Sequence, residues 1–359
     1  MFIVLFLLMI GVNVYLPWRL SALFALQNPV GLYVLFAVGL VSGFAARVLI
    51  TRYDNILVSA YYNVAGVWIG ILLYLSCLML IFEIVNRIHP LPPVKAGWTV
   101  IILTAIIVVY SLIKGISFKV NQIAVPVKDL KNEVKIVQIS DVHLGASRGK
   151  TYLAKIVQKA NELKPDFMVI TGDLADNKAA LREDMFAPFK EMQSPVYFVN
   201  GNHDVSAGLD KVMKRLKENN VIVLQNEVLV TNGIKLVGLN YMRVDDSVRD
   251  PHQVSNETMK AILPSLDLSG DYPKIVLHHV PWGVEYLNEQ GMDLVLAGHT
   301  HGGQMFPFNL LTKAVFPYNK GLAEYKGTYI YVSQGVGTFM TRMRFGTKNE
   351  IGFITLAPQ

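Results

Sequence analysis

The stretch Lys135-Ile-Val-Gln-Ile-Ser-Asp-Val-His143 decides how this chain folds, because an apolar, β-branched run leads directly into Asp141 and His143. Such a run predicts a buried strand, and the two polar side chains fall where that strand should end. Three later strings repeat this arrangement after apolar runs at 167–170, 196–199 and 294–296: Gly172-Asp173, Gly201-Asn202-His203-Asp204 and Gly298-His299-Thr300-His301.

The ends of parallel strands lie side by side, so polar groups that are distant in sequence should converge on one crevice of an α/β sheet. The converging groups are carboxylates, imidazoles and an amide, without a thiolate. This mixture suits manganese, iron, zinc or magnesium, and the sequence does not choose among these metals. Two divalent ions that share one carboxylate can clamp the attacking and leaving oxygens of a hydrolytic displacement, so we predict a two-metal site.

In this order the strings resemble the signature of the calcineurin-like metallophosphoesterase superfamily, D-x-H, G-D, G-N-H-[DE], H and G-H-x-H, over residues 134–358. The resemblance implies a phosphoesterase with two divalent metal ions. It assigns the first metal to Asp141, His143, Asp173 and His301, and the second metal to Asp173, Asn202, His279 and His299. Asp173 would be the bridging carboxylate.

His203 corresponds to the one histidine of these strings that does not bind a metal in the superfamily. The resemblance implies that His203 donates to the leaving-group oxygen, and that the adjacent Asp204 orients its ring. The alternative for Asp204 is a cap on the following turn.

Two adjacent histidines, His278 and His279, point to opposite faces of a strand, so only one can be a direct ligand. The superfamily writes this block as His-x-Pro, and Pro281 therefore selects His279.

Residues 335–346 are similar to a further block, G-x-G-T-x-x-x-P-x-R-F-G, in which Arg344 would bind a phosphate oxygen of the substrate. Arg342 stands where the proline is expected, and Gln334 where many members carry arginine. The alternative for Arg344 is a solvated arginine on a late strand.

The N-terminal third differs in composition from the rest. The mean hydropathy of +0.37 with 17% charged residues is too apolar for a soluble enzyme of 359 residues. Four apolar stretches account for the excess: residues 2–16, which Pro17 should end, 30–46, 64–85 and 98–113. We predict a transmembrane region of about four helices over 1–117, a linker over 118–133, and an α/β metallophosphoesterase domain over 134–359. That domain should be a two-sheet β-sandwich flanked by helices.

The distribution of basic residues favours a cell-membrane protein with the catalytic domain in the cytoplasm. If the N-terminus is inside, four basic residues flank the cytoplasmic ends and three flank the outer ends. One helix fewer would place the domain on the other side. The single cysteine, Cys77, permits no intramolecular disulfide and does not decide the side.

A second apolar run, residues 305–316, follows the last ligand string where a loop is expected. One interpretation is a cap packed on its own core. The other is a lid or apolar groove that accepts an acyl chain.

These features predict hydrolysis of a phosphodiester or pyrophosphate, with a lipid or nucleotide-linked lipid as the candidate substrate. Some members with a GHTHGGQ block, here residues 298–304, act on UDP-diacylglucosamine. The alternatives are a nuclease or cyclic-nucleotide phosphodiesterase at the membrane and a non-catalytic membrane binding module. Residues 119–359 carry 27 basic and 25 acidic groups, so no nucleic-acid partner is expected. No protein partner is indicated.

Overall fold

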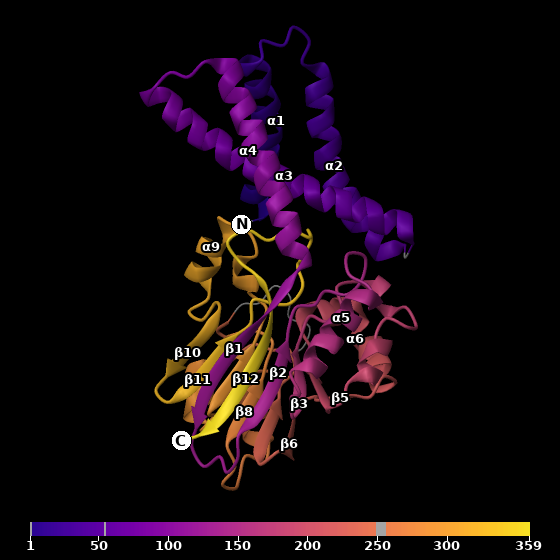
Figure 1. Ribbon diagram of the computed structural model, residues 1–359, viewed down its shortest axis with the longest axis vertical. Coiled ribbons are helices and arrows are strands. Elements are labelled where there is room, and N and C mark those ends of the chain that lie inside the picture. Colours follow the sequence, from indigo (N-terminus) through magenta and orange to yellow (C-terminus); the bar gives the residue numbers. More distant parts are fainter. Residues whose placement is uncertain (1, 54, 249–255) are drawn as a thin grey trace. The chain divides into compact units, whose positions relative to one another are not determined.

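The computed structural model describes residues 2–53, 55–248 and 256–359 (Figure 1). The chain divides into two compact units, Met1–Ile113 with Met340–Met343, and Lys114–Phe339 with Arg344–Gln359. Each unit is described by itself.

The first unit consists of α1 (Phe2–Leu23), α2 (Val30–Arg52), α3 (Ile56–Ile88) and α4 (Pro93–Ile116), whose last residues belong to the second unit. In the described part of the chain, α2, α3 and α4 are long and apolar enough to cross a membrane. The described apolar part of α1, Leu7–Leu23, is shorter. The prediction of N-terminal apolar helices is therefore confirmed, and among the described residues three of these helices are of spanning length.

The expectation that the first helix ends at Pro17 is wrong, because α1 continues through Pro17 to Leu23. A proline inside a helix removes one backbone hydrogen bond but does not have to end the helix. Beyond Pro17, Arg19 forms an ion pair with Glu83 of α3, and Leu20 is buried. These tertiary contacts stabilise the last turns.

The second unit contains two six-stranded mixed sheets, which confirms the predicted two-sheet sandwich. In spatial order the first sheet holds β1 (Phe118–Val127), β12 (Asn349–Pro358), β2 (Val134–Ile139), β3 (Phe167–Thr171), β4 (Val196–Val199) and β5 (Val221–Val223). The second holds β10 (Gly321–Tyr325), β11 (Thr328–Val332), β9 (Leu294–Ala297), β8 (Lys274–Leu277), β7 (Ile234–Gly238) and β6 (Glu227–Thr231). Strands β2 to β5 are parallel to one another, as are β7, β8, β9 and β11.

Side chains fill three layers around these sheets. Ile136, Phe167 and Leu296 belong to the core between the sheets. The outer face of the first sheet packs on α5 (Lys150–Glu162) and α6 (Asn202–Lys217), which Figure 1 shows beside β3 and β5. The outer face of the second packs on α7 (Met259–Ile262) and α8 (Val284–Glu289). Because both faces of the central strands are covered, these strands read as continuous apolar runs in the sequence.

The segment 118–133, expected to be a linker, instead contains β1, the edge strand of the first sheet. It pairs in parallel with β12 along its whole length, from Phe118 opposite Asn349 to Val127 opposite Pro358. Ile123, Val125 and Val127 are buried and alternate with exposed residues. This alternation has the period of a strand, but the partner strand lies at the far end of the sequence, so no local pattern indicated the pairing.

The start of β1 lies at the same end of the sheet as the ends of β2 to β4. Strand β12 runs antiparallel to β2, with Gly352 opposite Gln138, so Asn349 and its partner Phe118 lie beyond the carboxyl end of β2. The chain therefore enters the domain at the sheet edge where the predicted ligand strings lie.

We predict that Val125→Asp lowers the stability of the domain by about 3 to 5 kcal/mol, because a carboxylate would be buried without a partner. Ala124→Asp places the same charge on the exposed face of β1 and should leave stability nearly unchanged. Protease resistance of the purified full-length protein during heating measures both effects. Equal resistance of the two variants would contradict the assignment of β1 to the domain core.

Candidate metal centre

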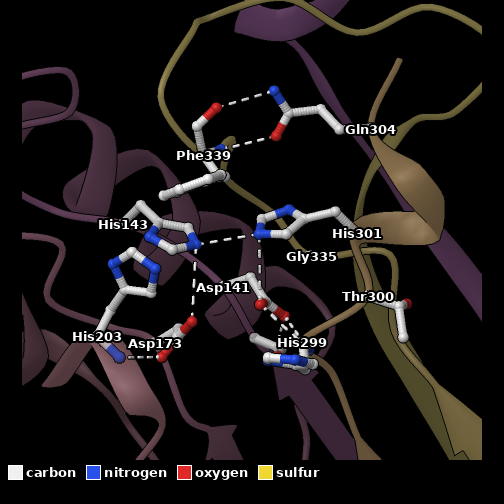
Figure 2. A network of polar contacts seen from close by, with 12 residues as sticks. Asp141, His143, Asp173, His203, His299, Thr300, His301, Gln304, Gly335 and Phe339 are labelled. Atoms are coloured by element: carbon white, nitrogen blue, oxygen red, sulfur yellow. Dashed lines mark hydrogen bonds and ion pairs between the residues drawn. The ribbon is translucent and has the colours of Figure 1, made fainter. Parts of the chain in front are cut away.

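The predicted ligand residues all lie at the carboxyl ends of parallel strands. Asp141 and His143 follow β2, Asp173 follows β3, Asn202 begins α6 just after β4, His279 follows β8, and His299 and His301 follow β9. Figure 2 shows that Asp141, His143, Asp173, His299 and His301 lie around one centre, with His203 beside them.

One cluster consists of Asp141, His143 and His301, whose ligand atoms lie within 4.8 Å of one another. His301 Nε2 is 3.4 Å from Asp141 Oδ1 and 3.0 Å from His143 Nε2. All three side chains are buried. These are three of the four residues expected to bind the first metal; the fourth is the shared carboxylate, Asp173.

A second cluster consists of Asp173, His279 and His299. His279 Nε2 lies 3.2 Å from Asp173 Oδ2 and 3.2 Å from His299 Nδ1. The same Asp173 oxygen is 3.9 Å from His143 Nε2 in the first cluster. Asp173 therefore lies between the two clusters, as a bridging ligand must.

The donor atoms of this site fit divalent cations. Imidazole nitrogens face each other in both clusters, and in the described part of the chain the buried Oδ1 of Asn202 has no hydrogen-bond partner. Burial and the charge of Asp173 raise the pKa of Asp141, so both disfavour its ionised form. A cation would oppose both effects by stabilising the ionised form.

The backbone at the clusters is held in an uncommon conformation. Asp141, His143, Asp173, His299 and His301 have φ between 50° and 72°, in the left-handed region that non-glycine residues rarely occupy. Such conformations cost free energy and concentrate at functional sites. Hydrogen bonds across the site hold them in place, including those from the His299 amide to the Asp141 carboxylate at 3.0 and 3.1 Å.

Asp176 is a site residue that the sequence reasoning missed. Its Oδ1 lies 3.2 Å from Nδ1 of His143 and 3.2 Å from Nδ1 of His203. Burial lowers the pKa of His203, but the charges of Asp173 and Asp176 outweigh burial and raise this pKa to about 9. The only signal in the sequence was a second aspartate three residues after Asp173.

Asp204 does not orient the His203 ring, because Asp176 occupies that position. The Asp204 carboxylate accepts hydrogen bonds from the amides of Ala175 and Gly201, both at 2.8 Å. Burial and the charge of Asp173 raise its pKa to about 7. Asp204 thus joins the loops after β3 and β4, which corresponds to the capping alternative.

The two adjacent histidines face different surroundings. His279 points into the second cluster, and its Nδ1 donates to the Thr171 carbonyl at 2.8 Å. His278 is buried beside the Val280 carbonyl, 2.7 Å away, and burial lowers its pKa to about 4. The geometry agrees with the choice of His279 as the ligand candidate.

Arg344 is fully buried, which contradicts the expectation of a solvated arginine, and its guanidinium is engaged by protein groups where the resemblance implied a substrate phosphate. The guanidinium donates to Asn349 Oδ1 at 2.5 Å and to the carbonyls of His301, Gln334 and Gly337 at 3.0, 2.5 and 2.8 Å. Burial lowers its pKa to about 10. Arg344 therefore holds the loop of His301 in place, and its donors are already used.

Aromatic rings flank the polar centre. The Phe339 ring lies 5.0 Å from the His203 ring, and its backbone is held by two hydrogen bonds to Gln304, as Figure 2 shows. On the other side, Phe316 lies 5.7 Å from the His299 ring and stacks on Trp282. The site therefore combines charged ligands with apolar walls.

Comparison with known proteins identifies the family. Residues 134–303 match the calcineurin-like phosphoesterase family. A metallophosphoesterase of Helicobacter pylori strain J99 is 33% identical over 245 residues, which cover 67% of this chain and 64% of that protein. The metallophosphoesterase YkuE of Bacillus subtilis is 30% identical over 239 residues, which cover 62% of this chain and 78% of that protein. The chain belongs to the calcineurin-like phosphoesterase family, which confirms the resemblance.

Membrane-spanning relatives also match. The transmembrane protein with metallophosphoesterase domain of Bos taurus is 32% identical over 251 residues, which cover 65% of this chain and 55% of that protein. The chain thus spans little more than half the length of this relative. Together with α2 to α4, this likeness indicates that the protein is associated with a membrane.

We predict that Asp176→Asn lowers kcat by about 10²-fold or more while KM changes little, because the His203 ring loses its orienting carboxylate. The pKa of His203 should fall with that charge, so activity should be lost at lower pH than in the wild type. Steady-state kinetics across pH measure both effects. The matched variant Asp204→Asn should reduce thermal stability and shift the pH profile less, because the charge of Asp204 raises the pKa of His203 less than that of Asp176. An unchanged profile in Asp176→Asn would contradict this role.

Proposed function

We propose that the protein is a membrane-anchored, two-metal phosphoesterase that hydrolyses a phosphodiester or pyrophosphate by direct attack of water. The observation that carries the proposal is the position of Asp173 between two clusters of histidine and aspartate side chains, all of them buried except the half-buried His299. When bound, two divalent ions would activate water and neutralise phosphoryl oxygens.

The ligand set of this proposal is Asp141, His143, Asp173, Asn202, His279, His299 and His301. It contains nitrogen and oxygen donors without sulfur, which suits manganese, iron, zinc or magnesium. Membership of the family and the two clusters support the binding of divalent metal ions. The proposal of two ions rests on the position of Asp173 between the clusters.

His203 is the proposed proton donor. Its Nδ1 is engaged by Asp176, so Nε2 is the nitrogen left to reach a leaving-group oxygen. Its side chain is 20% exposed, whereas that of His143 is 1% exposed. The raised pKa keeps the ring protonated at neutral pH, as a general acid requires.

The proposed substrate is a lipid or nucleotide-linked lipid. Two features support this class: the apolar rings of Phe316 and Phe339 beside the clusters, and the three helices that are long and apolar enough to span a membrane. The near balance of 27 basic and 25 acidic groups over residues 119–359 argues against the nuclease alternative. Every metal-ligand position of the family signature carries the expected residue type in this chain, which argues against a non-catalytic module.

We also propose a multi-pass protein with residues 1–117 in the membrane and the catalytic domain in the cytoplasm. If α1 also crosses the bilayer, four basic residues flank the cytoplasmic ends of the helices and three flank the outer ends, which supports this orientation.

The proposal predicts metal-dependent hydrolysis of bis(p-nitrophenyl) phosphate by the full-length protein in detergent. After chelation, activity should vanish and return with at least one of the four metals. Asp173→Ala should abolish both metal binding and activity, whereas His203→Ala should lower kcat by about 10² to 10⁴-fold and still bind metal. The control Asp184→Ala changes an aspartate that is 67% exposed and should keep full activity. Bound metal without hydrolysis would favour the non-catalytic alternative.

A lipid substrate predicts that Phe316→Ser selectively impairs long-chain esters. For p-nitrophenyl phosphodiesters that differ only in a hexadecyl or a methyl group, kcat/KM should fall by about tenfold for the first, which corresponds to the loss of about 1.4 kcal/mol of apolar contact. The methyl ester should be nearly unaffected. Equal losses on both esters would contradict an acyl-binding role for Phe316.

A further inference from the structure

The helix α9 (Phe308–Val315) carries apolar side chains on its outer face. Phe308, Leu311 and Val315, at helical spacing of three and four residues, are 44%, 61% and 64% exposed, and Leu310 is 58% exposed. Phe306, just before the helix, is 43% exposed. The helix has no buried residue, so α9 itself is not a cap packed on its own core, although Met305 before it is buried.

The inner face of α9 is polar, which is the reverse of a helix on a soluble domain. Asn309 and Thr312 are half-buried on the side that faces the protein. The Asn319 amide donates to Thr312 Oγ1 at 3.0 Å, and Thr312 Oγ1 donates to the Asn309 carbonyl at 3.2 Å. Of these two bonds, the one from Asn319 joins α9 to the rest of the domain, so the helix is attached on its polar side while its apolar face contacts no core.

The position of α9 is determined by the loop that carries His301. Gly303, with a φ of 84°, lies against the backbone of Asn309, where a Cβ would collide. The amide of Phe306 donates to the Phe345 carbonyl at 2.9 Å. These contacts hold the apolar face in one orientation beside the ligand clusters.

A lipid bilayer is the apolar medium that the sequence of this chain indicates. Helices α2, α3 and α4 are long and apolar enough to anchor the protein in a bilayer. In Figure 1, α9 and the start of β1 lie at the same end of the two sheets, and Phe118 is where the chain enters the domain. The exposed Lys313 and Lys320 add cations that anionic headgroups attract.

We propose that α9 inserts its outer face, Phe308, Leu310, Leu311 and Val315, into the lipid interface of the bilayer in which the protein is anchored. An apolar face bordered by lysines is typical of helices that lie in this interface. This inference does not depend on the proposed hydrolytic function, because it concerns a surface and not the reaction.

The test uses the full-length protein, one chain per nanodisc of phosphatidylcholine and phosphatidylglycerol. Cys77 is the only cysteine, so Cys77→Ser gives a background for single labels at Leu311→Cys and at the control Val230→Cys. Val230 is a similarly exposed apolar residue, 53% exposed, on β6. Each site is labelled with an environment-sensitive fluorophore and quenched by iodide in water or by doxyl groups on lipid chains.

We expect the label at 311 to be quenched severalfold more by the lipid-borne doxyl group than the label at 230, and to be protected from iodide. Free access of iodide to both labels would overturn the proposal. Protection from iodide without quenching by the lipid would show that protein covers α9, and would also overturn it. A further test combines Leu310→Glu and Leu311→Glu in one variant that is labelled at Val315→Cys. Iodide should reach this label more readily than the same label without the two glutamates, because charged side chains favour water.

Discussion

The site depends on one buried carboxylate, Asp173, that must remain ionised between two groups of histidines. Burial alone would raise its pKa, but the surrounding histidines His279, His203 and His143 hold that pKa well below its usual range. One oxygen faces His279 and His143, and the other accepts the His203 amide at 2.8 Å. Each neighbour of Asp173 comes from a different strand end, so the whole two-sheet arrangement is needed to assemble this environment.

A layer of buried polar contacts supports the ligands and joins them to the point where the chain enters the domain. Arg344 holds the His301 loop and donates to Asn349, whose amide donates to the Gly115 carbonyl at 2.8 Å. Arg148 donates to the same carbonyl at 2.7 Å. The last residues of α4, which belong to the second unit, are thereby fixed to the scaffold of the metal centre. This explains why an arginine that resembles a substrate-binding group is fully buried.

The apolar surroundings of the site form a second constraint. Phe316 ends the run that contains α9 and lies against the His299 ring, while Phe339 lies against His203. A phosphoester centre enclosed by apolar rings excludes part of the water that would otherwise compete for charge. In the same run, α9 turns Phe308, Leu310, Leu311 and Val315 outward, and a membrane-associated domain can retain such a surface where a soluble domain would aggregate.

The sequence by itself determined the ligand strings, the strands before them and the apolar N-terminal helices, because each is a local pattern in which side-chain type and period carry the signal. It also indicated that only one of His278 and His279 can be a ligand, since neighbouring residues of a strand face opposite sides, and the family resemblance then selected His279 through Pro281. Only the tertiary structure decided the pairing of β1 with β12, the partner of the His203 ring, the burial of Arg344 and the outward face of α9. Each of these depends on contacts between segments that are distant in sequence. The local sequence around an aspartate, an arginine or an apolar run does not show whether it is buried or exposed, because its neighbours are set by the fold.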